Sequence, residues 1–259
     1  MSIDMKILIT GYKGFIGSNL FKKLSKNHDV IGFDWGDEFP DIHGFDWVIH
    51  LGAISATTEK NVEKIMRHNY DFSVDLFDTC CDHRVNLQYA SSAQLYGLGT
   101  NFKEDAPVDP RSPYAWSKYL FERYARRNTP SDMIVQGFRY FNVYGPGEEQ
   151  KGNQASPFTK FQKQKNERGY IEVFAPAGKY RRDFVHVNDV IDYHIKFFSV
   201  KESGVWNIGT GETRSFLDIA EEIGGEVREI PVPDNVRPFY QEWTCADMTK
   251  TRQTLSKYK

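Results

Sequence analysis

Cysteine is scarce in this sequence, and no long apolar run occurs. The three cysteines are Cys80, Cys81 and Cys245, and an odd number with two adjacent members predicts neither a disulfide framework nor a zinc site. No stretch approaches the roughly 18 apolar residues of a membrane span. No signal-like apolar run precedes Gly11. We therefore expect a cytoplasmic chain with no metal and no membrane partner.

Basic charge is not in excess either. The 259 residues include 33 Lys and Arg against 35 Asp and Glu, which gives a formal net charge of −2. Proteins that capture nucleic acid through its phosphates usually carry a basic excess, so we expect no nucleic-acid partner. The length suits one large α/β domain, or a domain with a smaller partner.

What is present is an alternation of strand and helix patterns. Lys6 to Thr10 reads KILIT, a short branched run typical of a strand that is buried on both faces. Phe15 to Leu24 follows, with apolar residues at helical spacing. Further strands are predicted at Val30 to Phe33, Trp47 to Leu51, Asn86 to Ala90, Met133 to Phe138 and Val205 to Ile208, and further helices over 61–81, 114–127 and 215–223.

This order predicts an α/β fold with a doubly wound parallel sheet of the Rossmann type and a smaller carboxyl-terminal lobe. We expect residues 1–145 to form a dinucleotide-binding domain, to which residues 183–210 return in part. Residues 146–259 should mostly form a substrate-binding lobe. That lobe should cap the carboxyl edge of the sheet, where ligands of such sheets bind.

A glycine-rich turn joins the first predicted strand to the first helix. Gly11, Gly14 and Gly17 form a G-x-x-G-x-x-G pattern. The first glycine allows a tight turn, the second lets the backbone approach a pyrophosphate, and the third lets the helix pack closely. The start of a helix also favours a phosphate. Because the pattern lies between a strand and a helix, it favours a dinucleotide site over a turn with chance spacing.

An acid at the end of the second predicted strand bears on which dinucleotide binds. The carboxylate of Asp34 can accept hydrogen bonds from both adenosine ribose hydroxyls, and it repels a 2′-phosphate. The next four residues, WGDE, include no Arg or Lys. We therefore predict NAD as the cofactor in preference to NADP, with Asp34 and Trp35 at its adenosine end. An ordinary turn acid is the alternative.

Tyr114 and Lys118 begin a predicted helix as Y-x-x-x-K, and this spacing puts both side chains on one face. An ammonium near the phenol would lower the tyrosine pKa from about 10, which makes a usable proton acceptor. Ser91 and Ser92 follow the strand predicted to end at Ala90, so we expect their hydroxyls at the carboxyl edge of the sheet. Each feature alone is also typical of a solvated helix face or a turn.

In this order, the glycine loop, acid, serine and Tyr/Lys pair resemble the extended short-chain dehydrogenase/reductases. The likeness spans essentially the whole chain, and it includes YASSAQLYG (89–97), SPYAWSK (112–118), RYFNVYGP (139–146) and RRDFVHVNDV (181–190). With SATTE (55–59), KGNQAS (151–156) and NIGTG (207–211), the chain is similar to ADP-L-glycero-D-manno-heptose 6-epimerases. The resemblance implies an epimerase of a nucleotide-diphosphate sugar that works by transient oxidation to a ketone. Well-known members of that family use NADP, whereas Asp34 and the residues after it predict NAD here.

The resemblance also implies roles for single residues. Tyr114 and Lys151 match two proton-transfer residues that flank the sugar carbon, and Ser92 matches the active-site serine. Substrate contacts are implied for Asn142, Asn153, Lys160, Phe174, Arg182 and Tyr240, and cofactor contacts for Phe15, Ile16, Leu51, Gly52, Ala53, Ser55, Lys118 and Val143. The family has Ser and His in place of Asn153 and Lys160. The alternatives to these roles are a solvated loop lysine for Lys151 and a structural arginine that pairs with Asp183 for Arg182.

Other functions stay open from the sequence. A 4-epimerase, a reductase or a dehydratase could use the same scaffold, although dehydratases of this family usually carry an Asp-Glu pair where this chain has Ala93 and Gln94. A catalytically inactive NAD-binding sensor or scaffold is an alternative of another class, which the presence of Ser92, Tyr114 and Lys118 together disfavours. The helix over 61–81 could join copies in a homodimer or a larger homo-oligomer, or could pack only on its own sheet.

Overall fold

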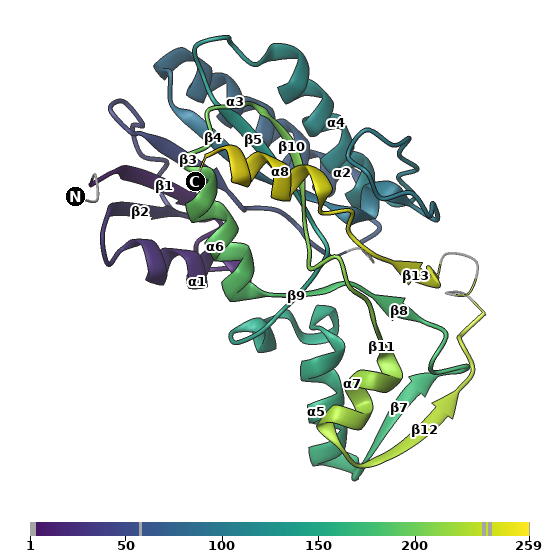
Figure 1. Ribbon diagram of the computed structural model, residues 1–259. Helices are drawn as coiled ribbons and strands as arrows, with labels where there is room; N and C mark the ends of the chain where they lie inside the picture. The colour runs from purple at the N-terminus through teal and green to yellow at the C-terminus, as the bar shows by residue number, and fades with distance from the viewer. Residues whose placement is uncertain (1–3, 57–58, 235–236, 238–239, 259) are drawn as a thin grey trace.

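Six parallel strands form the central sheet, in the order β10-β5-β4-β3-β1-β2 (Figure 1). The computed structural model describes residues 4–56, 59–234, 237 and 240–258. The strands are β1 (Lys6–Thr10), β2 (Asp29–Phe33), β3 (Trp47–His50), β4 (Asn86–Ser92), β5 (Val135–Tyr140) and β10 (Gly204–Ile208). Chain order reverses between β1 and β3, so the sheet has its switch point there, where ligands of such sheets bind.

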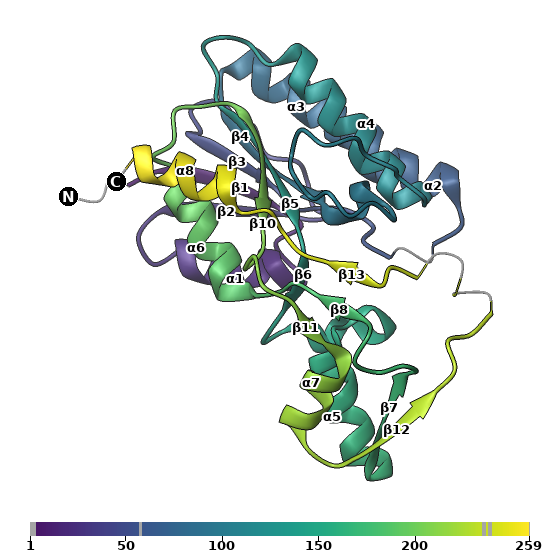
Figure 2. The same cartoon turned by 45° about the vertical axis from the view of Figure 1, so that its right-hand side comes forward.

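Helices cover both faces of this sheet, as Figure 2 shows. On one face lie α1 (Phe15–Leu24) and α6 (Val187–Phe197), which contact each other, and on the other lie α2 (Val62–Met66), α3 (Phe72–His83) and α4 (Pro113–Asn128). The last helix, α8 (Thr249–Lys257), packs beside β10. Because both faces are covered, the apolar residues of β1 are fully buried. The predicted doubly wound α/β class is confirmed.

A smaller lobe extends beyond the carboxyl edge of the sheet (Figure 1). It packs α5 (Pro157–Arg168) and α7 (Phe216–Ile223) against the parallel pair β7 (Tyr170–Phe174) and β12 (Glu226–Ile230), around a separate apolar core. Short strands connect it to the sheet: β6 (Asn142–Tyr144) pairs with β9 (Phe184–His186), and β11 (Arg214–Ser215), β8 (Arg181–Arg182) and β13 (Trp243–Thr244) form a small sheet. The domain boundary expected at residue 145 stays a prediction.

The helix predicted over 61–81 is divided in the structure. A π-helical turn, η1 (Arg67–Asp71), separates α2 from α3. It points the buried side chain of Asn69 at the loop after β3, where Asn69 accepts a hydrogen bond from Ile54 N (2.8 Å) and donates to Ile54 O (3.0 Å). Periodicity could not reveal this turn, because a single π turn only shifts the helical face locally. Contact of this helix with a second copy stays a prediction.

The prediction that β4 ends at Ala90 is wrong. The strand continues to Ser92 because β5 also runs two residues beyond its predicted end at Phe138. Ser91 then pairs with Arg139, and Ser92 pairs with Tyr140. Both serines are therefore held inside the sheet rather than in a turn. Their side chains have a fixed direction, which matters for the site below.

Candidate active site

A cavity of about 360 Å³ opens at the carboxyl edge of the sheet, beside the switch point. Residues from the glycine loop, the start of α1, the loop after β3, the start of α4 and the short 3-10 helix η3 (Glu148–Gln154) line it. The sequence-predicted residues that it brings together are Gly11, Gly14, Phe15, Ile16, Gly17, Leu51, Ala53, Ser55, Ser91, Tyr114, Lys118 and Lys151. Tyr140 and Gln150 also line it, and no sequence pattern had indicated them.

Two of the loop glycines, Gly11 and Gly17, leave no room for a side chain. A Cβ on Gly11 would lie 2.6 Å from the backbone nitrogen of Gly52, and its φ of +73° favours glycine. A Cβ on Gly17 would overlap the carbonyl oxygen of Gly11. Helix α1 begins directly at this loop, and no side chain caps it. An uncapped helix start beside closely packed loop glycines suits a pyrophosphate.

Tyr114 and Lys118 enter the cavity from the first turns of α4. Ser112 caps this helix, and its Oγ accepts a hydrogen bond from Ala115 N (3.1 Å). Lys118 is only 4% exposed, and its Nζ donates to the carbonyl oxygen of Ala90 (2.9 Å). Burial lowers the pKa of Lys118 to about 8. The lysine thus reaches the carboxyl end of β4 from the neighbouring helix.

The phenol of Tyr114 does not have the lowered pKa that the sequence led us to expect. Burial raises the pKa of Tyr114, and a hydrogen bond with Ser92 opposes this shift. Lys118 has no such effect on the phenol, because its ammonium is directed at the carbonyl of Ala90. In the protein alone, desolvation is the larger influence. A proton acceptor at Tyr114 therefore needs added positive charge.

A buried ion pair between Arg139 and Glu122 contacts Ser91 of β4. Ser91 Oγ donates to Glu122 Oε2 (2.9 Å), and Arg139 Nη2 lies 2.5 Å from Glu122 Oε1. The side chains of Arg139 and Glu122 are 3% and 2% exposed. The next serine, Ser92, accepts a hydrogen bond from Gln94 N (3.1 Å). It is nearly buried and contacts Tyr114 rather than the cavity surface.

Lys151 reaches the same cavity from η3. Its Nζ lies 5.4 Å from the centre of the Phe15 ring. Burial lowers the pKa of Lys151, while Glu148 opposes this shift and Lys160 adds to it. The segment before Lys151 is tied to α1, because Asn19 Nδ2 donates to the carbonyl oxygen of Pro146 (2.9 Å).

Asp34 and Trp35 lie at the end of β2, outside the cavity lining. Trp35 is 47% exposed and packs edge-on against His68, with ring centres 4.2 Å apart. Although residues 35–38 include no Arg or Lys, the fold brings a cation close to Asp34. Lys13 lies there, with its backbone nitrogen 3.2 Å from Asp34 Oδ2 and its Nζ 2.8 Å from Asp37 Oδ1. The glycine loop brings this lysine to β2, which no reading of residues 35–38 could reveal.

A second group of predicted residues gathers away from this cavity, in the smaller lobe. Tyr240 lies with its ring centre 5.4 Å from that of Phe174, and the guanidinium of Arg182 stacks 5.2 Å from the Tyr240 ring. Arg182 donates to the carbonyl oxygens of Arg181 and Gln241 and does not pair with Asp183. Asp183 instead accepts hydrogen bonds from the backbone of residues 210, 211 and 246.

The remaining predicted residues have less direct positions. Gly52 packs under Gly11, and Val143 packs in the core between α1 and α6. Asn142 is exposed at the start of β6. Lys160 lines a separate groove of about 1100 Å³ along α5. The side chain of Asn153 lies outside the described part of the chain.

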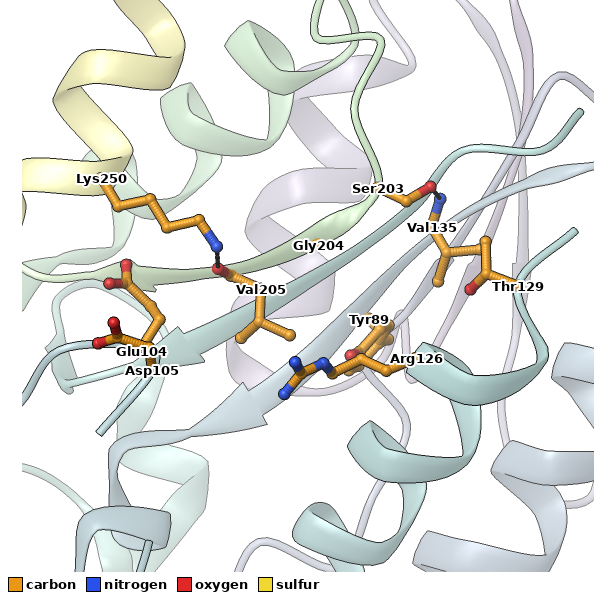
Figure 3. Close-up of a pocket in the computed structure, with 10 residues that line it drawn as sticks. All are labelled: Tyr89, Glu104, Asp105, Arg126, Thr129, Val135, Ser203, Gly204, Val205 and Lys250. Atoms are coloured by element: carbon orange, nitrogen blue, oxygen red, sulfur yellow. Dashed lines mark hydrogen bonds between the residues drawn. The ribbon is translucent and has the colours of Figure 1, made fainter. Parts of the chain in front are cut away.

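Figure 3 shows another cavity, of about 340 Å³, beside the edge strand β10. Lys250 donates there to the carbonyl oxygen of Val205, and Ser203 accepts a hydrogen bond from Val135 N. None of the predicted site residues lines it. Within the described ranges, no group of three or more His, Cys, Asp or Glu could hold a metal ion. In the same ranges, no helix has the length and apolar character needed to span a membrane.

Comparison with known proteins agrees with this geometry. The sequence profile of the NAD dependent epimerase/dehydratase family matches residues 7–209. The ADP-L-glycero-D-manno-heptose-6-epimerase of Helicobacter pylori is similar, with 27% identity, a TM-score of 0.85, and coverage of 98% of this chain and 91% of that one. MoeE5, solved with UDP-glucuronic acid and NAD, has 26% identity, a TM-score of 0.80, and coverage of 97% and 92%. The NAD-dependent NDP-hexosamine 5,6-dehydratase TunA has 25% identity, a TM-score of 0.80, and coverage of 97% and 91%.

Proposed function

The chain belongs to the NAD dependent epimerase/dehydratase family, and we propose that it is a NAD-dependent epimerase of a nucleotide-diphosphate sugar, of the ADP-glycero-manno-heptose 6-epimerase type. One observation carries this proposal: a single cavity holds the glycine loop, the Tyr114/Lys118 pair and Lys151. A one-way reductase needs one proton-transfer group, whereas an epimerase must serve both faces of one carbon. Two titratable groups on separate elements meet that need.

The residues at the glycine loop fit a dinucleotide. The loop admits no side chain at Gly11 or Gly17, so backbone and helix start remain open to a pyrophosphate. Asp34, which follows β2 beside this loop, is proposed to bind the adenosine ribose, and the exposed ring of Trp35 is proposed to lie at the same end of the cofactor. NAD held by these residues would supply a hydride acceptor and donor and, in its oxidised form, a positive charge.

Tyr114 is proposed to take the proton from a sugar hydroxyl while the carbon is oxidised to a ketone. Its raised pKa makes the neutral phenol the resting form, and Ser92 holds the hydroxyl in place. Lys118, kept at the end of β4 by Ala90, adds a cation to this region below a pH of about 8. The proton acceptor therefore forms only when positive charge is assembled around it.

Lys151 is proposed to act at the opposite face after the ketone has turned. Its pKa is lowered by burial, so a larger neutral fraction can exchange a proton near neutral pH than for a solvated lysine. Arg182, Phe174 and Tyr240 are proposed to hold the nucleotide-diphosphate part, with the guanidinium toward the diphosphate. Asn142, which is exposed at the start of β6, is proposed to contact the sugar.

A dehydratase, a reductase or a 4-epimerase is the second candidate within the family. The similarity to TunA is a specific reason to keep the dehydratase. Against it, Ala93 and Gln94 follow Ser92, and neither side chain can act as a general acid or base. An inactive NAD-binding protein is the alternative of another class.

The test is incubation of the purified protein with a panel of nucleotide-diphosphate sugars in deuterated water, with and without deuterated NAD. Mass spectrometry and NMR would follow the products. A new epimer with no net change in mass and no net reduction of NAD supports the proposal. Loss of water indicates a dehydratase, and stoichiometric NADH indicates a dehydrogenase. NAD binding without turnover of any sugar would leave only the inactive alternative.

A further inference from the structure

The glycine loop carries a lysine, Lys13, whose ammonium forms an ion pair with Asp37. Lys13 Nζ lies 2.8 Å from Asp37 Oδ1 and 3.0 Å from Asp37 Oδ2. The same carboxylate accepts a hydrogen bond from the backbone nitrogen of Asp34 (2.9 Å). Asp37 therefore does two things: it fixes the turn that follows β2, and it engages the lysine that the glycine loop presents.

This pair lies beside the carboxylate assigned to the adenosine ribose. Lys13 N is 3.2 Å from Asp34 Oδ2, and Gly11 N donates to the carbonyl oxygen of Phe33 (2.8 Å), so loop and strand end are joined. If the ribose hydroxyls donate hydrogen bonds to Asp34, the 2′ position of the ribose lies near both Asp34 and Lys13. The site thus contains a carboxylate that favours a hydroxyl and a cation that would favour a phosphate.

The local charges decide which of the two prevails. Asp34 and Asp37 carry two negative charges against the one positive charge of Lys13, so a 2′-phosphate meets a net negative site. The side chains of Lys13 and Asp37 are 54% and 33% exposed, so salt in the solvent weakens the attraction between them. His68, which packs against Trp35, has a pKa lowered by burial and contributes little positive charge at neutral pH.

We propose that Asp37 sets the choice between NAD and NADP by holding Lys13 away from the ribose 2′ position. The inference rests on the proposed dinucleotide site and concerns only its adenosine end. Neutralising Asp37 should free the ammonium and convert a site that rejects a 2′-phosphate into one that accepts it. Asp34 then remains as a single carboxylate, balanced by Lys13.

Two small probes isolate this effect: adenosine 5′-monophosphate and adenosine 2′,5′-bisphosphate, which differ only by the 2′-phosphate. Calorimetry would measure both with the intact protein and with Asp37→Asn, which keeps a side-chain oxygen for the backbone nitrogen of Asp34. We expect the affinity ratio to shift toward the bisphosphate by at least about tenfold. The shift should shrink at high salt, since the ammonium is exposed.

Glu38→Gln is the matched control, because it removes the same charge one residue further on from an exposed side chain. It should change the ratio far less than Asp37→Asn. Adding Lys13→Met to Asp37→Asn should cancel the shift. Equal shifts in Asp37→Asn and Glu38→Gln, or a shift that persists without Lys13, would overturn the inference. A wild-type protein that binds neither NAD nor either probe would instead contradict the proposed function.

Discussion

The two ends of the candidate cofactor site contain a lysine each, and the two lysines behave in opposite ways. At the deep end Lys118 is 4% exposed, and burial lowers its pKa to about 8. At the open end Lys13 has a side chain that is 54% exposed, and its hydrogen bond with Asp37 raises its pKa. Desolvation dominates where no carboxylate is near, and the partner dominates where water remains.

The same contrast holds for the ion pairs. Arg139 and Glu122 are buried behind β4, whereas Lys13 and Asp37 face solvent. Loss of one partner leaves an unpaired charge without water in the first case and a solvated charge in the second. The deep end is therefore where substitutions should have large effects, and the open end is where they should change selectivity with little effect on stability.

The largest effect is expected for Glu122→Gln at the deep end. It leaves the buried guanidinium of Arg139 without a counter-charge, so we expect the free energy of unfolding to fall by about 3 kcal/mol. Urea unfolding followed by circular dichroism would measure it. Asp37→Asn, the exposed counterpart, should change stability by less than about 1 kcal/mol. Similar losses in the two variants would contradict the contrast between the ends.

Tyr114→Phe should lower turnover by at least about 10²-fold, the usual contribution of a positioned acid or base. NAD binding should change little, because Lys118 and the glycine loop remain. Steady-state rates with the best nucleotide sugar, together with calorimetry for NAD, would separate the two. A variant that keeps more than about a tenth of the activity would exclude Tyr114 as the proton-transfer group.

Lys151→Met should slow the interconversion of the two epimers by about 10²-fold while hydride transfer at one face continues. The reason is that Tyr114 alone can serve one face of the carbon. NMR starting from each epimer in turn would follow the interconversion, and cofactor absorbance would follow single-turnover oxidation. Interconversion at the wild-type rate would show that Lys151 is a loop lysine with no part in proton transfer.

Lys118→Met should raise stability at neutral pH, although it removes a group proposed for function. The pKa of Lys118 is about 8 in the folded chain and 10.5 for a solvated lysine, so its burial costs stability below a pH of about 8. That cost is relieved as the pH rises toward 10.5, where the unfolded chain also loses the proton. We expect a gain of about 2 kcal/mol at pH 7, after loss of the bond to Ala90.

The gain should be absent at high pH, where wild type and Lys118→Met should converge. Urea titrations of both proteins across this pH range would measure the difference. A Lys118→Met protein that is less stable than wild type at neutral pH would mean that the hydrogen bond to Ala90 outweighs desolvation.

The smallest effect is expected at the open end. NAD should bind at least about tenfold tighter than NADP, a difference of about 1.4 kcal/mol. A cation, Lys13, does lie beside Asp34, but its ammonium forms an ion pair with Asp37, so it is not available to a 2′-phosphate. Calorimetry with both dinucleotides would measure the ratio. Equal or tighter binding of NADP would show that Lys13 leaves Asp37 readily.

Local sequence features predicted much of the site. The order of strands and helices, the glycine loop and the i, i+4 pair of Tyr114 and Lys118 follow from periodicity and from the properties of glycine. These are short-range features, so one segment at a time is enough to find them. The same reasoning gave a wrong end for β4, because the length of a strand depends on its neighbour β5.

What the sequence by itself determined is the fold class and the set of chemical groups, since both depend on residue type and local spacing. Only the tertiary structure decided how those groups are paired. It set Lys13 against Asp37, directed Lys118 at Ala90, and gave Arg182 two backbone carbonyls instead of Asp183. These pairings join segments far apart in the chain, and the burial that shifts each pKa exists only once those segments have packed together.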